Sequence, residues 1–78
     1  IYPNPSSDKI HLRTASDIHA ETMIALYDGS GKILYAGSFD QIMSRETIEI
    51  DLSGFHHGIY ILQLKNIAFM ITKKIVKQ

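Results

Sequence analysis

The chain has no cysteine, no tryptophan and only two prolines in 78 residues. Without cysteine it can form neither a disulfide framework nor a thiolate metal site, and it has no cysteine nucleophile. No uncharged run approaches the roughly 20 residues that a membrane-spanning helix needs. The hydrophobic fraction of 45% is too high for intrinsic disorder, and the length suits one small domain. The composition therefore predicts a single soluble globular domain, held together by hydrophobic packing.

Charge is balanced overall but not along the chain, since eight Lys and Arg offset eight Asp and Glu. Residues 1–64 hold four basic and eight acidic residues, whereas residues 65–78 hold four lysines and no acid. Four lysines without interleaved aromatic side chains or a known motif do not make a nucleic-acid site, and they are few for a lipid-directed cluster. We expect neither nucleic-acid binding nor stable membrane insertion.

Short apolar segments separated by turn residues predict β-strands. After an extended N-terminal segment and a turn at residues 4–8, strands are expected at residues 9–13, 23–27, 32–37, 47–52, 59–64 and 69–76. Six or seven strands with no convincing helix predict an all-β fold, a small antiparallel β-sandwich. Because cysteine and tryptophan are absent, it is not an antibody-type domain.

These segments predict different degrees of burial. Residues 47–52 alternate strictly, which predicts a half-exposed strand, whereas residues 23–27 and 59–64 are apolar enough for strands buried on most of both faces. The lysine-rich residues 69–76 suit a sheet edge. Residues 39–45 read as a loop with a helical turn that Asp40 could cap.

Residues 28–32, Asp-Gly-Ser-Gly-Lys, resemble a phosphate-binding loop only superficially. They lack the spacing before Gly-Lys and the following Ser or Thr, and no helix follows. We expect a hairpin turn in which Gly29 and Gly31 supply positive φ.

Four histidines are the first candidates for metal binding: His11, His19, His56 and His57. Adjacent histidines in an extended segment point to opposite sides, and zinc ligands are usually two to four residues apart with a second, distant pair. The pattern therefore favours loop and surface histidines over a metal site.

Glu49 and Asp51 lie two residues apart on one predicted strand, so they share a face and could act in general acid–base catalysis. On so polar a face, two solvated surface carboxylates are the favoured interpretation. The serines lie in ordinary polar loops, and none has the setting of a catalytic nucleophile. We expect no enzymatic activity.

A sugar-stacking platform would use aromatic side chains, and the chain offers Tyr2, Tyr27, Tyr35, Phe39, Phe55, Tyr60 and Phe69. Alternating tyrosines in strands are more often core or cross-strand packing. A carbohydrate-binding or adhesive accessory module of a secreted enzyme stays the alternative hypothesis.

Five segments occur in a characteristic order: residues 1–10 (IYPNPSSDKI), 25–34 (ALYDGSGKIL), 50–53 (IDLS), 58–64 (GIYILQL) and 72–77 (TKKIVK). Together they resemble the type A C-terminal sorting domain of the type IX secretion system. The resemblance covers essentially the whole chain. Two turns depart from the pattern, because residues 55–57 lack a frequent proline and residues 66–68 lack a frequent glycine.

The resemblance implies an immunoglobulin-like sandwich without catalytic activity or cofactor, at the end of a larger secreted protein of a Gram-negative bacterium. The fused upstream cargo would cross the periplasm, engage the translocon and its shuttle components, and reach the cell surface or the medium. A sortase-like peptidase would then remove the domain by cleavage before Ile1. The motif positions would be Pro3, Asn4, Pro5, Gly31, Lys32, Gly58, Tyr60, Lys74, Ile75, Val76 and Lys77.

Physical roles follow for these positions as hypotheses. Pro3 and Pro5 would stiffen the junction with the cargo. Gly58 would turn the chain sharply, and Tyr60 would bury its ring with its hydroxyl near a polar partner. The lysines of the last strand would present an exposed basic edge, so that replacing Lys74 and Lys77 by Glu would impair export without unfolding the domain. Gln78 directly after the motif suits a C-terminus.

Overall fold

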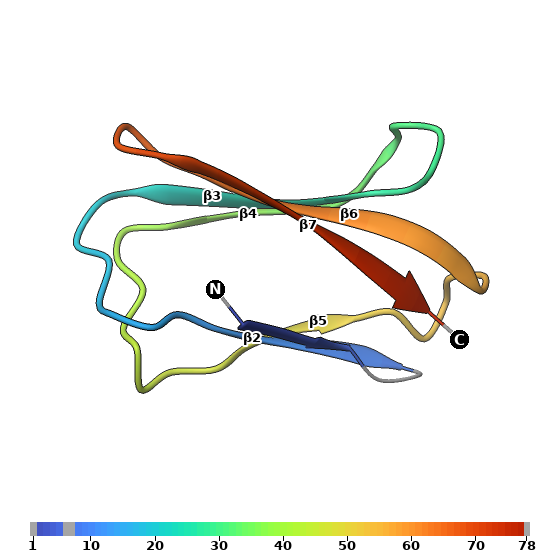
Figure 1. The fold of residues 1–78 in the computed structure, drawn as a ribbon, viewed down its shortest axis with the longest axis horizontal. Helices are drawn as coiled ribbons and strands as arrows, with labels where there is room; N and C mark the ends of the chain where they lie inside the picture. The colour runs from blue at the N-terminus through green and yellow to red at the C-terminus, as the bar shows by residue number, and fades with distance from the viewer. Residues whose placement is uncertain (1, 6–7, 78) are drawn as a thin grey trace.

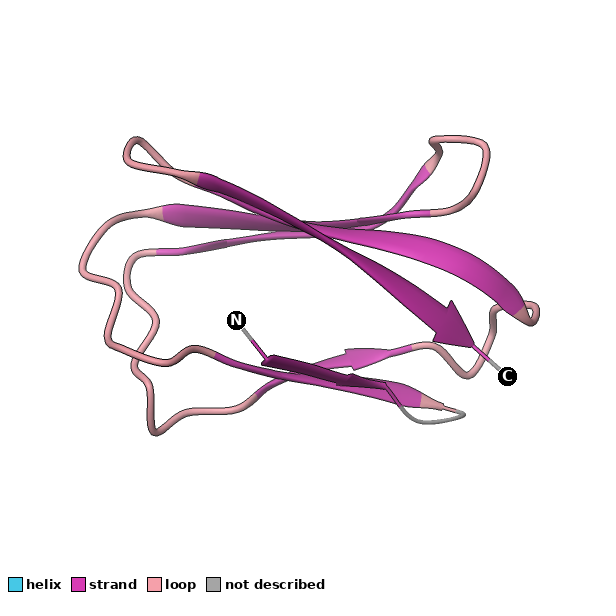
Figure 2. Ribbon diagram, viewed as in Figure 1, coloured by secondary structure: helices cyan, strands magenta, loops and turns pink. Residues whose placement is uncertain are grey.

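Seven strands of the described chain form two antiparallel sheets that pack face to face (Figures 1 and 2). The computed structural model describes residues 2–5 and 8–77. Within these residues, no helix is long and apolar enough to span a membrane. The arrangement is that of a small immunoglobulin-like β-sandwich, which confirms the predicted fold class. The strands are β1 (Tyr2–Pro5), β2 (Lys9–Arg13), β3 (Thr22–Tyr27), β4 (Ile33–Phe39), β5 (Ile48–Asp51), β6 (Gly58–Lys65) and β7 (Met70–Lys77).

The strand order is β1-β2-β5 in one sheet and β4-β3-β6-β7 in the other. The predicted edge position of the last strand is confirmed, and β6 lies between β3 and β7. Where the two sheets approach each other along one side, β1 lies near β7 (Figure 1). The predictions that concern Ile1, Ser6, Ser7 and Gln78 fall outside the described residues.

Strict alternation produces the predicted half-buried strands of the three-stranded sheet. In the antiparallel register Ile10 lies opposite Ile50, and both side chains are buried against the second sheet. His11 lies opposite Glu49 in the same pair of strands and faces solvent. Since side chains of successive residues point to opposite faces, one row lines the core and the next meets water.

The four-stranded sheet corrects the prediction that two strands are buried on both faces. Ile24 on β3 and Leu62 on β6 are fully buried, but Met23 is 56% exposed and Ile59 is 53% exposed. The physical reason is that a two-layer sandwich covers only one face of each sheet, and no described segment covers the outer face of this one. In β3 and β6, every second side chain therefore points away from the core, although most of each strand is apolar.

The core lies between the sheets, and its buried members among the described side chains come from β2, β3, β5, β6 and β7 and from the connections. Partly buried side chains at its rim, among them Phe39, Phe55 and Phe69, pack against it. Because buried aliphatic side chains each contribute about 1.5–3 kcal/mol, this layer is the main source of stability. Its buried hydrophobic members are Ile10, Leu12, Ile24, Leu26, Ile42, Ile50, Leu52, Tyr60, Leu62, Leu64 and Ile75.

The connection after β4 is the predicted loop, but it contains no helix, so the helical part of the prediction for residues 39–45 was wrong. Instead Ile42 pairs with Ile18 in an isolated antiparallel bridge, with N–H···O distances of 2.7 and 2.9 Å. Ile42 is 3% exposed and joins the core. Capping by Asp40 does not occur there, because hydrophobic burial and the bridge determine this backbone.

Candidate functional site

The turn between β3 and β4 is organised by one carboxylate. Oδ1 of Asp28 accepts hydrogen bonds from the Ser30 N–H (2.9 Å), the Ser30 hydroxyl (2.7 Å) and the Lys32 N–H (3.0 Å). The hydrogen bond from the Ser30 hydroxyl is the main cause of the lowered pKa of Asp28, and the hydrogen bond from the Lys32 N–H is the second. Gly31 has a φ of 90°, whereas Gly29 does not have a positive φ, so only one of the two predicted glycines has this role. Lys32 is exposed just before β4.

The turn between β5 and β6 is closed by Tyr60, as predicted. Tyr60 is 6% exposed, and its hydroxyl donates a hydrogen bond to the carbonyl of His56. Its ring lies 6.0 Å from the ring of Phe55, at an interplanar angle of 30°. Gly58, at the start of β6, has a φ of 149° in the region that favours glycine. The predicted burial of Tyr60 and the predicted backbone conformation at Gly58 are therefore observed, and the part of both residues in a sorting motif stays a prediction.

Lys77 contradicts the predicted basic edge. It is only 7% exposed, and its ammonium donates hydrogen bonds to the carbonyls of Leu52 (2.7 Å) and Phe55 (2.6 Å). Because residues two apart on a strand share a face, Lys77 points inward with Ile75, which belongs to the core. Lys74 is exposed on the opposite face, as the prediction required.

These contacts join β7 to the connection between β5 and β6. The buried ammonium of Lys77 binds two carbonyls of one turn, and the hydroxyl of Tyr60 binds a third. We call these three hydrogen bonds the C-terminal clasp. The sequence did contain a signal for it, since the position of Lys77 two residues after Ile75 implied the inner face.

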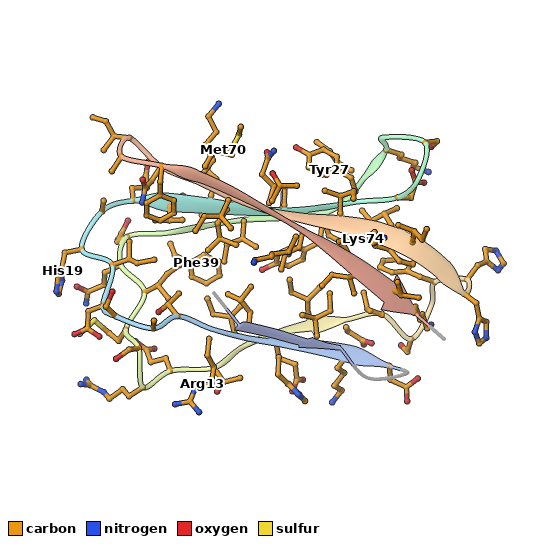
Figure 3. The ribbon with its side chains drawn as sticks, in the orientation of Figure 1. Arg13, His19, Tyr27, Phe39, Met70 and Lys74 are labelled. Carbon is orange, nitrogen blue, oxygen red and sulfur yellow. The ribbon has the colours of Figure 1, made fainter. Side chains whose placement is uncertain are left out.

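Two of the turns lie at this end of the sandwich, where β7 also ends (Figure 1). A shallow hollow is lined by residues 28–30 of one turn and by residues 56–60 of the other. A side chain at Gly29 would contact the carbonyl oxygen of Ile59 at 3.9 Å. In Figure 3, Lys74 lies toward this end and His19 lies at the opposite end. We call the end that holds the clasp and this hollow the motif end.

Most of the motif positions come together at the motif end from three separate segments. Residues 58–60 and 74–77 pair directly in the sheet, with Gly58 opposite Lys77. Gly31 and Lys32 belong to the turn whose residues 28–30 line the hollow beside residues 56–60. Within the last segment Val76 is 46% exposed.

Pro3, Asn4 and Pro5 lie on β1, which belongs to the other sheet and lies near β7. Pro3 pairs with Leu12, Asn4 with His11, and Pro5 with Ile10. Proline lacks a backbone donor and is found in sheets mainly on edge strands, which fits the position of β1 at the end of its sheet. Their predicted role at a junction with cargo stays a prediction.

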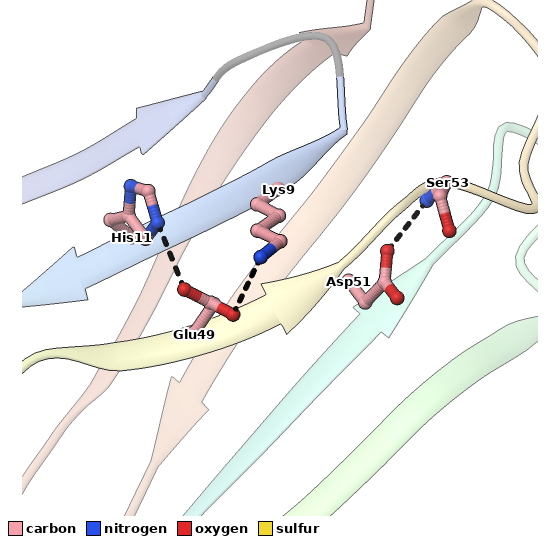
Figure 4. A network of polar contacts seen from close by, with 5 residues as sticks. All are labelled: Lys9, His11, Glu49, Asp51 and Ser53. Atoms are coloured by element: carbon pink, nitrogen blue, oxygen red, sulfur yellow. Dashed lines mark hydrogen bonds and ion pairs between the residues drawn. The ribbon is translucent and has the colours of Figure 1, made fainter.

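The carboxylates that could have served catalysis lie on the outer face of the three-stranded sheet (Figure 4). Glu49 forms an ion pair with Lys9 (3.2 Å) and a hydrogen bond with Nε2 of His11 (3.1 Å), and the hydrogen bond from Lys9 is the main cause of its lowered pKa. Asp51 accepts the Ser53 N–H at 2.8 Å, which lowers its pKa. Both groups stay ionised at neutral pH and have different partners, an arrangement typical of surface carboxylates.

The histidines are dispersed. His19, His56 and His57 are exposed in loops, and His11 contacts Glu49. Among the residues that the structure describes, no three His, Cys, Asp or Glu side chains come close enough to hold a metal ion.

The aromatic side chains do not form an exposed platform in the part of the chain that the structure describes. The one ring pair there joins Phe55 to Tyr60, and Tyr60 is buried. Tyr35, Phe39 and Phe69 pack against the core, and Tyr27 is half-buried. The side chain of Tyr2 is not among those described.

A comparison with protein families matches residues 1–78 to the secretion system C-terminal sorting domain. The chain belongs to this family. Neither the curated proteins nor the solved structures contain a match to it. Membership makes the chain a C-terminal sorting signal for type IX secretion, and the family is not a catalytic one. Sorting domains of this kind are attached to an upstream cargo and lead to the cell surface or the extracellular space.

Proposed function

We propose that this sorting domain directs a cargo fused before Ile1 from the periplasm through the type IX translocon, and that the motif end is the surface that the export machinery contacts. The observation that carries the proposal is that two distant motif segments pair in the sheet, beside the turn that holds the third. A sortase-like peptidase then removes the domain upstream of Ile1, and the cargo is released or attached to the surface.

The buried and the exposed motif residues have different roles in this proposal. Gly58, Tyr60 and Lys77 shape the motif end through the turn and the clasp. Lys32 and Lys74 are exposed there and offer two ammonium groups to an acidic surface of the translocon or its shuttle component. Contact and folding can therefore be tested with different substitutions.

The test is an export assay with residues 1–78 fused to the C-terminus of a periplasm-directed fluorescent reporter. Expression in a bacterium with a type IX system and in a translocon-deficient strain should give reporter outside the outer membrane only in the first strain. A reporter that stays periplasmic in both strains, while circular dichroism shows a folded domain, overturns the proposal.

The contact surface is tested in the same assay with the double variant K32E/K74E. Its export should fall about tenfold, because two favourable charge contacts become repulsive. The matched control is Lys65→Glu, which reverses an exposed strand lysine at the far end of β6 and should leave export unchanged. Equal loss with both variants would mean that net charge, and not the motif end, governs export.

A further inference from the structure

The open edges of the two sheets differ in how they discourage pairing with another strand. Native edge strands usually carry charge or proline, because their free backbone groups otherwise recruit a further strand. On β1 there are two prolines, on β5 there are Glu49 and Asp51, and on β7 there are lysines. On β4, residues 33–39 contain neither charge nor proline.

The outer edge of β4 is also free within the described structure. It is the last strand in the order β4-β3-β6-β7, so its hydrogen bonds to β3 use only one side. It runs for seven residues, longer than β1 or β5. An uncharged strand of this length is the edge of this molecule best suited to strand addition.

We propose that β4 pairs antiparallel with β4 of a second copy of this chain, so that the two four-stranded sheets become one sheet across a twofold axis. A twofold axis places like residues near each other, and a strand without charge meets its own copy without repulsion. The same pairing through β7 would bring Lys73 and Lys74 of both copies together. Charge thus permits self-association at one edge of the sheet and opposes it at the other.

Charges at the two ends of β4 set the register of this pair. Lys32 precedes the strand and Asp40 follows it, each four residues from Ala36, and both are exposed. In an antiparallel pair centred on Ala36, Lys32 of each copy therefore approaches Asp40 of the other. A bulge in the register of β3 and β4 places Ile33, not Lys32, in the same-face row as Ala36. The ammonium of Lys32 therefore reaches Asp40 of the other copy through the length of its exposed side chain. The edge is charge-complementary to itself.

The centre of the strand leaves room for a second backbone. Ala36, Gly37 and Ser38 are small, and the rings of Tyr35 and Phe39 cover Gly37 from the inner face. A Cβ at Gly37 would lie 2.8 Å from the Tyr35 hydroxyl oxygen and 3.3 Å from the Phe39 ring. Aromatic cover over an edge glycine keeps such a strand in register for pairing. This inference stands on the edge itself and not on the sorting role.

Sedimentation of the 78-residue chain over a wide concentration range tests the proposal, with circular dichroism as the check on folding. The wild type should change from monomer to dimer as its concentration rises. Ala36→Lys places two ammonium groups at the twofold axis and should abolish the dimer. The matched control is Thr72→Lys, in the same cross-sheet row on β7, which should leave the dimer intact.

Charge reversal tests the register without disturbing the strand. Lys32→Glu and Asp40→Lys should each weaken dimerisation about tenfold, and the double variant K32E/D40K should restore it. A wild type that stays monomeric throughout overturns the proposal, as does a dimer that Ala36→Lys leaves intact. Failure of the double variant to recover would overturn this register. If Ala36→Lys does not fold, these exposed positions decide the question.

Discussion

The two ends of the sandwich are closed by different chemistry. At the motif end, the clasp binds three turn carbonyls through the ammonium of Lys77 and the hydroxyl of Tyr60. At the opposite end, Ile18 and Ile42 form a backbone bridge, and the Ile42 side chain fills the core. There Asp17 accepts the Ser44 N–H at 2.7 Å. One end depends on buried polar groups, and the other on apolar packing.

This difference shows why a sequence motif can mark the motif end and not the other. Many aliphatic side chains can fill an apolar gap, so packing tolerates substitution. A buried ammonium is stable only while its carbonyl partners are in place, because its desolvation is costly. Few other residues can therefore replace Gly58, Tyr60 and Lys77 in these contacts. The short segments that contain them are easy to recognise in a sequence.

The largest effect should come from removing the ammonium at the clasp. Lys77→Met keeps most of the aliphatic stem but leaves the carbonyls of Leu52 and Phe55 without their donor. We expect a loss of about 3 kcal/mol in the free energy of unfolding, measured by urea denaturation. Lys74→Met, on the exposed face, should change it by less than about 0.5 kcal/mol. Equal effects of the two variants would remove the distinction between the faces of β7.

The second effect concerns the tyrosine of the clasp. Tyr60→Phe retains the buried ring but removes the donor to the His56 carbonyl, and it should cost about 1.5 kcal/mol. Tyr27→Phe removes a hydroxyl from a half-buried ring on the outer face and serves as the control. Thermal unfolding of both variants gives the comparison. A Tyr60→Phe domain as stable as the wild type would mean that the ring alone closes this turn.

The third effect tests the apolar end. Ile42→Val removes one buried methylene group and should cost about 1 kcal/mol in urea unfolding. Ile67→Val makes the same change at a side chain that is 98% exposed, and it should have no measurable effect. If Ile42→Val were harmless, the bridge with Ile18 would be held by its backbone alone.

Period-two patterns predicted the strands correctly because alternation follows directly from strand geometry. They placed residues 9–13 and 47–52 close to their observed bounds. The continuous runs 23–27 and 59–64 were correctly predicted as strands, but their burial was overestimated. Local sequence does not reveal how many layers of structure cover a sheet. The bridge at Ile42 was missed, since a single paired residue leaves no periodic signal.

The candidate site was predictable in its residues but not in their contacts. Resemblance supplied Gly58, Tyr60 and Lys77, and chemistry suggested that Tyr60 is buried. That Lys77 is buried too depends on carbonyls of a turn 22 to 25 residues away in the sequence. Lysine is rarely buried, so composition favours an exposed position until the partners are known.

The smallest expected effect is on the pH dependence of stability, to which both ends contribute. Asp28 and Asp51 lie at the motif end and Asp17 at the opposite end, and their hydrogen bonds lower the pKa of each below its ordinary value. A carboxyl whose pKa is lower in the folded state stabilises the fold above its unfolded pKa of 3.8, and this contribution disappears as pH falls through the folded pKa. Stability should therefore decrease on acidification below about pH 4.

Replacing these aspartates by asparagine shows how much each end contributes to the loss of stability in acid. Asp28→Asn and Asp17→Asn should each be less stable than the wild type at neutral pH and should approach it in acid, where the wild-type carboxyls are protonated. The double variant D28N/D51N should flatten the pH profile more than Asp17→Asn, because it removes two carboxyls of lowered pKa and Asp17→Asn removes one. Thermal unfolding between about pH 2 and pH 7 measures the profiles. A profile flattened most by Asp17→Asn would reverse the assignment, and the apolar end would then be the more sensitive to acid.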